Sequence, residues 1–235
     1  FLMICLPPDF DFPLSSAESD LFKRQIHMIS LDNTSSIIEF TRLYLAVFYS
    51  AVALFYTVRI ITAQKSTNTG LVFPGERFCS HWWNHMTFRL FRVSIWMVCV
   101  VRLFFPALDE YLGLITTFDN ALVLILGNIL LTFGFLMTII IHFSMKQKWR
   151  SGVDPKGPDG LITDGFFKYS RNPIFVSVAL SQLGFFLALP SLFTLVCLII
   201  GLYTLFKQAT VEEQHLAEIF PNNYKTYQAN VRRWL

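Results

Sequence analysis

Long stretches without a charged residue dominate the chain. Residues 43–58, 120–145 and 173–206 carry no formal charge, and residues 88–106 form a fourth run that is apolar apart from its arginines. About 20 apolar residues in an α-helix span the hydrocarbon core of a bilayer, because a helix satisfies its backbone hydrogen bonds internally. These runs therefore predict membrane-spanning helices.

The longest run, residues 173–206, is interrupted by a proline. Pro190 cannot continue a helical hydrogen-bond ladder, and it divides the 34 uncharged residues into two segments of 17. Each segment would be about 25 Å long, near the lower limit for crossing a bilayer. The pattern predicts a C-terminal helical hairpin that enters and leaves at the same face. The expected fold class is an all-α integral membrane protein with about five transmembrane helices.

The segment before the second apolar run has a different character. Residues 77–92, RFCSHWWNHMTFRLFR, are aromatic, basic and only partly apolar, which predicts a helix lying in the membrane interface. His81 and His85 are four residues apart, but no third ligand lies nearby in the sequence, so an interfacial belt beside Trp82 and Trp83 is favoured over a metal site. No metal is expected.

Composition agrees with a membrane protein and restricts its partners. The chain is 54% hydrophobic and 15% charged, whereas soluble domains are about 25% charged. Its net charge of +3 includes no basic run, so a nucleic-acid partner is not expected, and membrane lipids are the expected surroundings. The four cysteines lack CxxC spacing, which indicates packed thiols rather than a metal site or disulfide framework.

The positions of lysine and arginine predict the orientation. If residues 146–172 face the cytoplasm, alternation of the spans places 15 of the 19 basic residues on that side. The acidic N-terminal stretch, residues 1–36, then lies on the opposite face. We therefore expect a multi-pass protein whose loop 146–172 and C-terminus are cytoplasmic.

Polar residues gather at the predicted mouth of the hairpin, in the sequence GFFKYSRNPIF (165–175). Asn172 and Pro173 suit the N-cap and first position of a helix, and the basic residues suit the cytoplasmic side, so a purely structural interpretation stays open. The glycine-rich loop before them can bring backbone groups close to a small polar ligand. The hairpin should also bring Glu212 and Glu213 near Arg171 and Asn172, and acids so close to a membrane are expensive unless solvated, paired or serving a cationic ligand.

The order of these pieces resembles a known family. LITDGFFKYSRNPIF, a hairpin, and then EEQHLAEIFPNNYKTYQANVRRWL are similar to the isoprenylcysteine carboxyl methyltransferases and their bacterial and phospholipid-methylating relatives. That family shows Leu-Val-Thr-x-Gly-x-Tyr, Arg-His-Pro-x-Tyr, a hairpin, a Glu-Glu pair and a terminal Phe-Gly-x-x-Tyr-x-x-Tyr. The resemblance covers roughly residues 120–235. The resemblance implies a methyltransferase-like catalytic core at 113–235. The hydropathy and charge pattern predicts the two parts before it, an extracytoplasmic segment at 1–36 and a part with two membrane helices and the interfacial helix at 37–112.

The resemblance implies that S-adenosylmethionine binds beneath the loop before the hairpin. It implies a methyl acceptor that is lipophilic or delivered by the membrane, such as a lipid-modified molecule. The residues implied as catalytic are Arg171 and Glu212, and those implied as substrate-binding are Gln208 and Arg150. The residues implied as cofactor-binding are Asp159, Gly160, Leu161, Ile162, Phe167, Tyr169, Asn172, Pro173, Phe175, Glu212 and Glu213.

The chain departs from the family pattern where the acceptor is chosen. Asn172 stands in place of a histidine, Phe167 and Phe175 in place of tyrosines, and Gln208 where prenylcysteine enzymes have a substrate-binding arginine. A prenylcysteine carboxylate is therefore not assured as the acceptor, and a thiol, an amine headgroup or a lipid phenol stays open. Two other functions also stay open: an NADPH-dependent reductase, because sterol reductases share an Arg-His-Pro turn, and a non-catalytic membrane scaffold.

Overall fold

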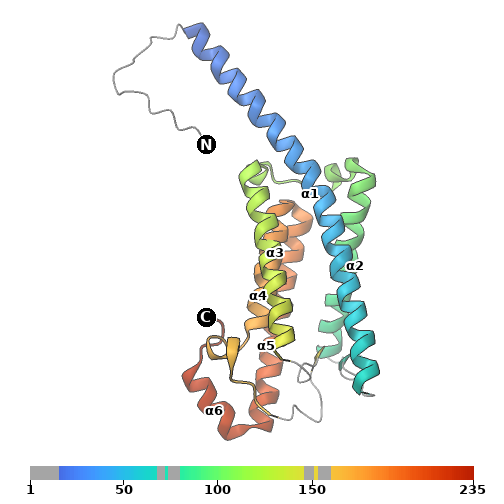
Figure 1. The fold of residues 1–235 in the computed structure, drawn as a ribbon, viewed down its shortest axis with the longest axis vertical. Coiled ribbons are helices and arrows are strands. Elements are labelled where there is room, and N and C mark those ends of the chain that lie inside the picture. The colour runs from blue at the N-terminus through green and yellow to red at the C-terminus, as the bar shows by residue number, and fades with distance from the viewer. Residues whose placement is uncertain (1–15, 68–71, 74–79, 146–150, 153–159) are drawn as a thin grey trace, which may run out of the picture.

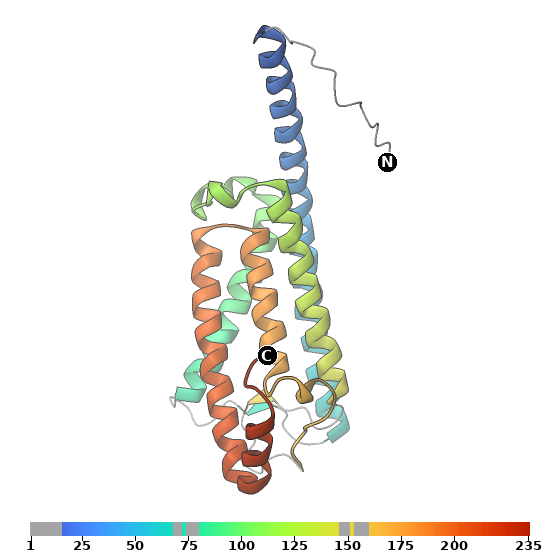
Figure 2. The same cartoon turned by 90° about the vertical axis from the view of Figure 1, so that its left-hand side faces the viewer.

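The computed structural model describes residues 16–67, 72–73, 80–145, 151–152 and 160–235. Within these ranges the chain forms a bundle of long helices that run nearly parallel to one axis (Figure 1, Figure 2). The helices are α1 (Ser16–Thr67), α2 (Ser80–Phe104), α3 (Ala121–Ser144), α4 (Pro173–Ala188), α5 (Leu192–Ile219) and α6 (Pro221–Asn230). The N-terminal half of α1 projects beyond the bundle, whereas α6 turns back and lies beside the end of α5 (Figure 1).

Short elements close the two ends of the bundle. The far end, where α4 turns into α5, carries the 3-10 helices η1 (Pro106–Tyr111) and η2 (Thr116–Phe118). The site end, where α4 begins and α5 finishes, carries the 3-10 helix η4 (Gly165–Lys168) and α6. A parallel pair of two-residue strands, β1 (Val72–Phe73) and β2 (Ser151–Gly152), joins the segment after α1 to the segment after α3.

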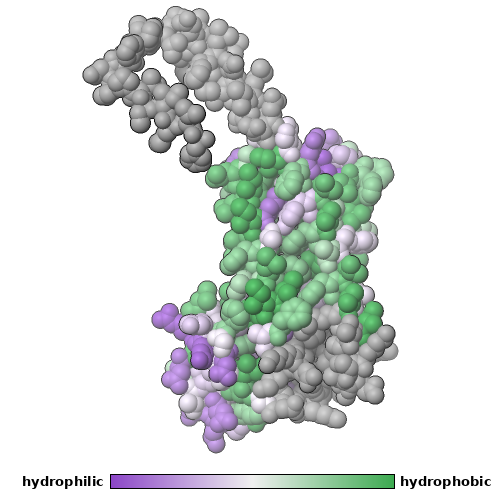
Figure 3. Space-filling model, in the orientation of Figure 1, coloured by the Kyte–Doolittle hydropathy of each residue, from purple (hydrophilic) through white to green (hydrophobic). Residues whose placement is uncertain are grey.

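The exposed surface of the bundle confirms an all-α integral membrane protein. Three helical stretches in the described residues are long and apolar enough to cross a bilayer, namely Thr34–Val58, Ala121–Ser144 and Leu192–Ile219, and α4 is a shorter apolar helix. Large apolar side chains such as Leu122 and Ile199 are mostly exposed on them. In Figure 3 hydrophobic residues cover the middle of the visible face, while hydrophilic residues gather over α6 and at the top of the bundle.

The predicted hairpin is confirmed, with one difference in length. Ser191 begins α5 with a capping box to Thr194, and the hairpin tip is attached to the segment before α3, because the Ile115 N–H donates to the Pro190 carbonyl at 2.8 Å. The second arm does not end near Phe206 as the loss of apolar character predicted. It continues to Ile219, since residues 207–219 contain good helix formers and no glycine or proline.

Close backbone contact holds α3 against α4. A Cβ atom added to Gly127 would lie 2.2 Å from the Ala188 nitrogen, and one added to Gly184 would lie 2.2 Å from the Leu131 nitrogen. Between membrane helices, such small residues allow the backbones to approach and gain dispersion contacts. The α3–α4 pair is therefore a rigid support for the residues at the foot of α4.

The segment around residues 77–106 differs from the prediction. An interfacial helix was expected over residues 77–92, followed by a membrane helix from residue 88, but Ser80–Phe104 is one continuous helix. Because Ser80–Phe104 contains no glycine or proline, nothing in it interrupts the helical hydrogen bonds. His81 and His85 have side chains outside the described residues, and no group of three metal-ligating residues occurs in the described part.

A buried ion-pair cluster closes the far end, and we call it the Asp109 cluster. The Asp109 carboxylate in η1 accepts a hydrogen bond from Arg42 Nη2 of α1 at 2.9 Å and from Arg102 Nη2 of α2 at 3.1 Å, and Arg102 Nε donates to it as well. Only 4% of the Arg102 side chain is exposed. Arg102, the charged residue near the end of the apolar run 88–106, is therefore paired with Asp109.

Candidate functional site

The turn before α4 meets the last part of α5, as the predicted hairpin requires. The Asn172 side-chain amide donates a hydrogen bond to Glu213 Oε1 at 2.6 Å, and Arg171 Nη2 lies 3.7 Å from Glu213 Oε2. Asn172 and Arg171 are largely buried, since 6% of the Asn172 residue and 9% of the Arg171 side chain are exposed. The antiparallel arms therefore place Glu213 beside the Arg-Asn-Pro turn.

A second arginine reaches the same carboxylate from the C-terminal segment. Arg233 Nε lies 3.4 Å from Glu213 Oε1, and Arg233 Nη2 donates to Thr210 Oγ1 at 2.7 Å. The guanidinium also lies over the Phe206 ring, 4.9 Å from its centroid. We call Arg171, Asn172, Glu213 and Arg233 the Glu213 cluster.

Backbone carbonyls of the C-terminal segment hold the turn in place. The Arg171 N–H donates to the Arg232 carbonyl at 3.0 Å, and the Asn172 side chain donates to the Arg233 carbonyl at 3.1 Å. Asn172 occupies the N-cap position of α4, but its side chain accepts no capping hydrogen bond. Pro173 takes the first helical position and is buried. The amide of Asn172 therefore links segments distant in the sequence instead of capping the helix.

Glu212 points to a different set of partners, because neighbouring residues on a helix are rotated by about 100°. Its Oε1 accepts a hydrogen bond from Gln208 Nε2 at 2.9 Å, and Gln208 Oε1 accepts one from Asn84 Nδ2 of α2 at 3.1 Å. Asn84 also donates to the Thr204 carbonyl at 3.3 Å. This amide chain joins α2 to α5 and orients the Glu212 carboxylate.

Two tyrosines of α6 lie close to the turn. The Tyr227 hydroxyl donates to the Phe167 carbonyl in η4 at 2.7 Å, and burial raises the pKa of Tyr227 to about 12. Tyr224 is 3% exposed. Burial raises the pKa of Tyr224, and the negative charge of Glu213 raises it further, whereas the positive charge of Arg171 and a hydrogen bond with its side chain lower it. The Tyr224 hydroxyl is thus electrostatically coupled to the Glu213 cluster.

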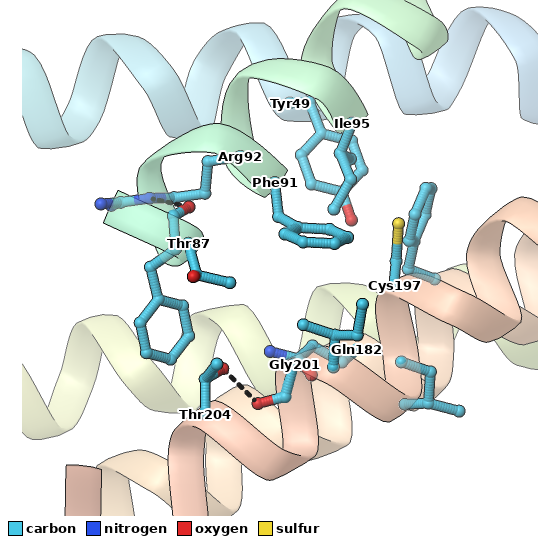
Figure 4. A pocket seen from close by; sticks show the side chains of 13 residues that line it. Tyr49, Thr87, Phe91, Arg92, Ile95, Gln182, Cys197, Gly201 and Thr204 are labelled. Atoms are coloured by element: carbon cyan, nitrogen blue, oxygen red, sulfur yellow. Dashed lines mark hydrogen bonds between the residues drawn. The ribbon is translucent and has the colours of Figure 1, made fainter. Parts of the chain in front are cut away.

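A cavity of about 70 Å³ lies between α1, α2, α4 and α5 (Figure 4). Tyr49, Phe91 and Cys197 give it largely apolar walls, while Arg92 lies at its side. Thr204 closes one wall, with its hydroxyl donating to the Gly201 carbonyl (Figure 4). Because Asn84 also bonds to the Thr204 carbonyl, the cavity ends about one helical turn from Gln208.

The other residues implied by the resemblance surround the turn only in part. Arg150 and Asp159 lie outside the described residues. Phe167 and Phe175 are half-buried, as are Gly160, Leu161 and Ile162, whereas Tyr169 is 75% exposed. Of the residues named from the sequence, the structure thus joins Arg171, Asn172 and Glu213 in one cluster and Gln208 and Glu212 in another.

Sequence reasoning missed three residues that contact these groups: Asn84, Tyr224 and Arg233. Tyr224 belongs to the Tyr-x-x-Tyr pair in FPNNYKTY, which is a recognisable signal. Arg233 was counted only as one of the basic residues of the tail. Asn84 lies in the part of the chain without any family signature, so no pattern pointed to it.

Comparison with known proteins identifies the part of the chain that holds this site. Residues 122–223 match the model of a family described as phospholipid methyltransferase. No curated protein and no solved structure matches the chain. The match implies a membrane methyltransferase, and it confirms the resemblance drawn from the ordered motifs. The matched segment, from residue 122 to residue 223, includes both arms of the hairpin and the two glutamates, and it is similar to the phospholipid methyltransferase family.

Proposed function

We propose that the protein transfers a methyl group from S-adenosylmethionine to a lipophilic acceptor that reaches it through the membrane. The observation that carries this proposal is the arrangement of the hairpin within the matched segment. Arg171 and Asn172 meet Glu213 at one end of an apolar bundle, and Glu212 lies one residue away. A water-soluble cofactor and a membrane-soluble acceptor can meet only at such a boundary.

The polar groups of this end suit the cofactor. Arg171 Nε and Nη1 are buried, and they have no hydrogen-bond partner among the described residues. Buried donors without partners are costly unless a ligand or water completes them. Arg171 and Asn172 would hold or orient the ligand's carboxylate, and Glu212 would accept hydrogen bonds from its ribose hydroxyls or amino group.

The chemistry needs no metal and no covalent intermediate. Bound S-adenosylmethionine would supply an activated methyl group: the acceptor's electron pair bonds to that carbon while the carbon–sulfur pair stays on sulfur, which becomes a neutral thioether. The chain's residues then have to align the acceptor with the methyl carbon and exclude water. We assign these tasks to Arg171 and Glu212, and cofactor contacts to the segment 159–162 and its neighbours Phe167, Tyr169, Pro173 and Phe175.

The cavity between α2 and α5 suits the lipophilic part of the acceptor. Its walls are mostly apolar, it lies among the helices that would face the bilayer, and it ends near the Asn84–Gln208–Glu212 chain. Gln208 is a neutral donor and acceptor at the place where prenylcysteine enzymes have an arginine. It and Arg150 are our candidates for contact with the acceptor's reactive head, whose chemical type stays open among thiol, carboxylate, amine and phenol.

The proposed orientation places the site end in the cytoplasm, where S-adenosylmethionine is made. It rests on the excess of lysine and arginine near that end. Residues 113–235 would then form the catalytic core, with residues 1–36 on the opposite side of the membrane. Labelling of single introduced cysteines on either side of sealed vesicles tests this arrangement.

Calorimetry on the purified protein in detergent tests the proposed function. We expect S-adenosylmethionine or its demethylated product, S-adenosylhomocysteine, to bind with a Kd on the order of micromolar. Titration with NADPH alongside distinguishes a methyltransferase from a reductase. Absence of binding by the adenosyl ligands would contradict the proposal.

The variant Glu212→Gln tests the assignment of one acid. Glutamine keeps an acceptor for Gln208 but loses the charge, so we expect a folded protein that binds S-adenosylhomocysteine about 10-fold more weakly. Glu218→Gln is the matched control, because Glu218 is an exposed acid on the same helix. Equal affinity of both variants and the unchanged protein would remove Glu212 from the site.

A further inference from the structure

One amide on the wall of the cavity between α2 and α5 makes no hydrogen bond. Gln182 of α4 reaches this cavity beside Gly201, where an added Cβ atom would lie 2.3 Å from Gln182 Oε1. That oxygen is buried without a partner, and Nε2 of the same amide has no hydrogen bond among the described residues either. The Gly201 carbonyl beside it already accepts a hydrogen bond from the Thr204 hydroxyl. A buried amide in this state is costly unless a ligand or water completes it.

Gln182 differs from the other described side chains that have a buried polar atom without a partner. In each arginine and asparagine of that kind, another atom of the same group is paired. Arg102 Nη2, for example, donates to Asp109, and Asn128 Nδ2 donates to Thr41 Oγ1 at 2.8 Å. Those groups link helices, whereas the Gln182 amide links nothing in the described part of the chain. Packing of the bundle therefore does not explain a polar side chain at this place.

A second polar group faces the same cavity from α1. The Tyr49 ring packs edge-on against Phe185, with the ring centroids 5.1 Å apart, and its hydroxyl points into the cavity (Figure 4). Phe185 follows Gln182 by about one turn of α4, so Tyr49 and Gln182 approach the cavity from neighbouring walls. Within the described ranges, the Tyr49 hydroxyl makes no hydrogen bond to another residue.

The depth and the chemistry of these two groups indicate what would satisfy them. Tyr49 belongs to the apolar stretch Thr34–Val58 and Gln182 to the apolar helix α4, so both lie where bulk water does not compete for hydrogen bonds. A phenol and an amide are uncharged, and each can donate and accept. A hydroxyl group does the same. A hydrocarbon chain would leave both groups unsatisfied, and a charged group would be costly to desolvate.

We propose that the cavity binds a hydroxyl-bearing segment of a lipid, with the hydroxyl between Tyr49 and Gln182. The inference rests on the proposed function in taking this lipid as the methyl acceptor, and it names the acceptor as a lipid alcohol rather than a plain hydrocarbon chain with a reactive head. The volume of about 70 Å³ suits a short segment of such a chain. Gly201 precedes Glu212 by about three helical turns, or about 16 Å, so this hydroxyl is a recognition group and not the methylated atom.

Photolabelling measures this binding without any cofactor. An octanol that carries a diazirine on its chain is added to the purified protein in detergent and irradiated, and mass spectrometry identifies the labelled residues. We expect label on the cavity walls, at Phe91 of α2 and Leu198 of α5. Unlabelled 1-octanol and nonane, which have the same number of non-hydrogen atoms, then compete. We expect 1-octanol to compete about 10-fold more strongly than nonane.

Three variants test the two polar groups. Gln182→Leu and Tyr49→Phe should each lower the preference for 1-octanol over nonane about 3- to 10-fold, while nonane still competes. Thr87→Val is the matched control, because it removes a cavity-wall hydroxyl that already donates to the Trp83 carbonyl at 2.9 Å, and the preference should not change. Thermal unfolding should show Gln182→Leu to be at least as stable as the unchanged protein, because it removes an unsatisfied amide. A marked loss of stability would mean that this amide has a partner in the protein, and the inference would be wrong.

The outcomes separate this inference from the proposed function. If the unchanged protein does not prefer 1-octanol, or if Gln182→Leu and Tyr49→Phe keep the preference, the inference is wrong even where the cofactor binds. Stronger competition by octanoate that disappears in Arg92→Gln would assign the cavity to an anion beside Arg92 and would also overturn it. If 1-octanol is preferred as expected but neither S-adenosylmethionine nor S-adenosylhomocysteine binds, the proposed function fails and the hydroxyl-binding cavity stands.

Discussion

Two clusters with the same ionic composition lie at opposite ends of the bundle. In each, two arginines surround one carboxylate: Arg42 and Arg102 around Asp109, and Arg171 and Arg233 around Glu213. In the Asp109 cluster, both arginines donate hydrogen bonds to the carboxylate. In the Glu213 cluster, the ionic contacts are 3.4 and 3.7 Å long, and the shortest bond comes from the neutral Asn172.

The difference shows that composition alone does not define a site. Arg42, Arg102 and Asp109 come from α1, α2 and η1, and their hydrogen bonds hold these three elements together. The Glu213 cluster joins the foot of α4 to α5 and to the C-terminal segment, but its cations are held loosely. A loosely paired buried cation can exchange its partner for a ligand at small cost, and a tightly paired one cannot.

The largest difference should appear when each carboxylate is neutralised. Asp109→Asn leaves two buried guanidinium groups without a counter-charge, so we expect a loss of about 3–5 kcal/mol in the free energy of unfolding. Unfolding in denaturing detergent measures it, and Glu110→Gln serves as control because Glu110 is exposed on the same 3-10 helix. If Asp109→Asn lost less free energy of unfolding than Glu213→Gln, the Asp109 cluster would not be the more strongly stabilising of the two.

Acid should weaken the Asp109 cluster in a defined direction. Burial by itself raises the pKa of Asp109, but hydrogen bonds from Arg102 and Arg42, and their charges, outweigh burial, so the pKa lies below its usual range. The carboxylate therefore contributes stability above its unfolded pKa of about 3.9, and this contribution disappears as the pH falls through the folded pKa. The stability gap between the unchanged protein and Asp109→Asn should stay constant at higher pH and narrow as the pH falls below about 4. A constant gap would contradict the ionic role.

Neutralising Glu213 should cost less stability and more ligand affinity. In Glu213→Gln the amide oxygen still accepts the hydrogen bond from Asn172, so we expect a loss of about 1–3 kcal/mol in the free energy of unfolding. In this variant Arg171 loses the carboxylate that orients it, so S-adenosylhomocysteine should bind more weakly. Asp109→Asn, measured under conditions in which it is folded, should bind S-adenosylhomocysteine with unchanged affinity. Normal binding by both variants would show that the two clusters are equally structural.

The smallest expected effect concerns the C-terminal arginine. Arg233→Ala removes a long ion pair, a hydrogen bond to Thr210 and a contact with the Phe206 ring, so a loss of about 1 kcal/mol is expected. Arg232→Ala, an exposed neighbour, is the control for stability. Thermal unfolding of both variants measures the difference, and equal stability would mean that Arg233 is not bound in solution as described.

The sequence was sufficient for the features that depend on chain connectivity. Pro190 within an uncharged run predicted the hairpin, and the hairpin predicted that Glu212 and Glu213 would lie near Arg171 and Asn172. Glu213 contacts both residues, whereas Glu212 is hydrogen-bonded to Gln208 instead. The length of the second arm was not predictable from hydropathy, because helix propensity continues through residues 207–219 after the apolar character ends. The same reason explains why Ser80–Phe104 is one helix although its two halves differ in polarity.

Contacts between elements distant in the sequence were beyond such reasoning. The partner of Gln208 is Asn84, 124 residues earlier, and its selection depends on how α2 packs against α5. The side chain of Asn172 matched a helix cap by position, yet the carbonyl of Arg233 and the carboxylate of Glu213 take its hydrogen bonds. Local pattern identified the polar residues, but only packing determined their partners.

The unbroken course of α5 has a mechanical consequence. The helix α5 carries Gly201 and Thr204 on the wall of the cavity and, two to three turns later, the adjacent acids Glu212 and Glu213. A helix twists and slides as one piece, with no joint between these positions at which a displacement would be absorbed. A molecule that fills the cavity and displaces this part of α5 would therefore also change the direction of the two carboxylates at its end.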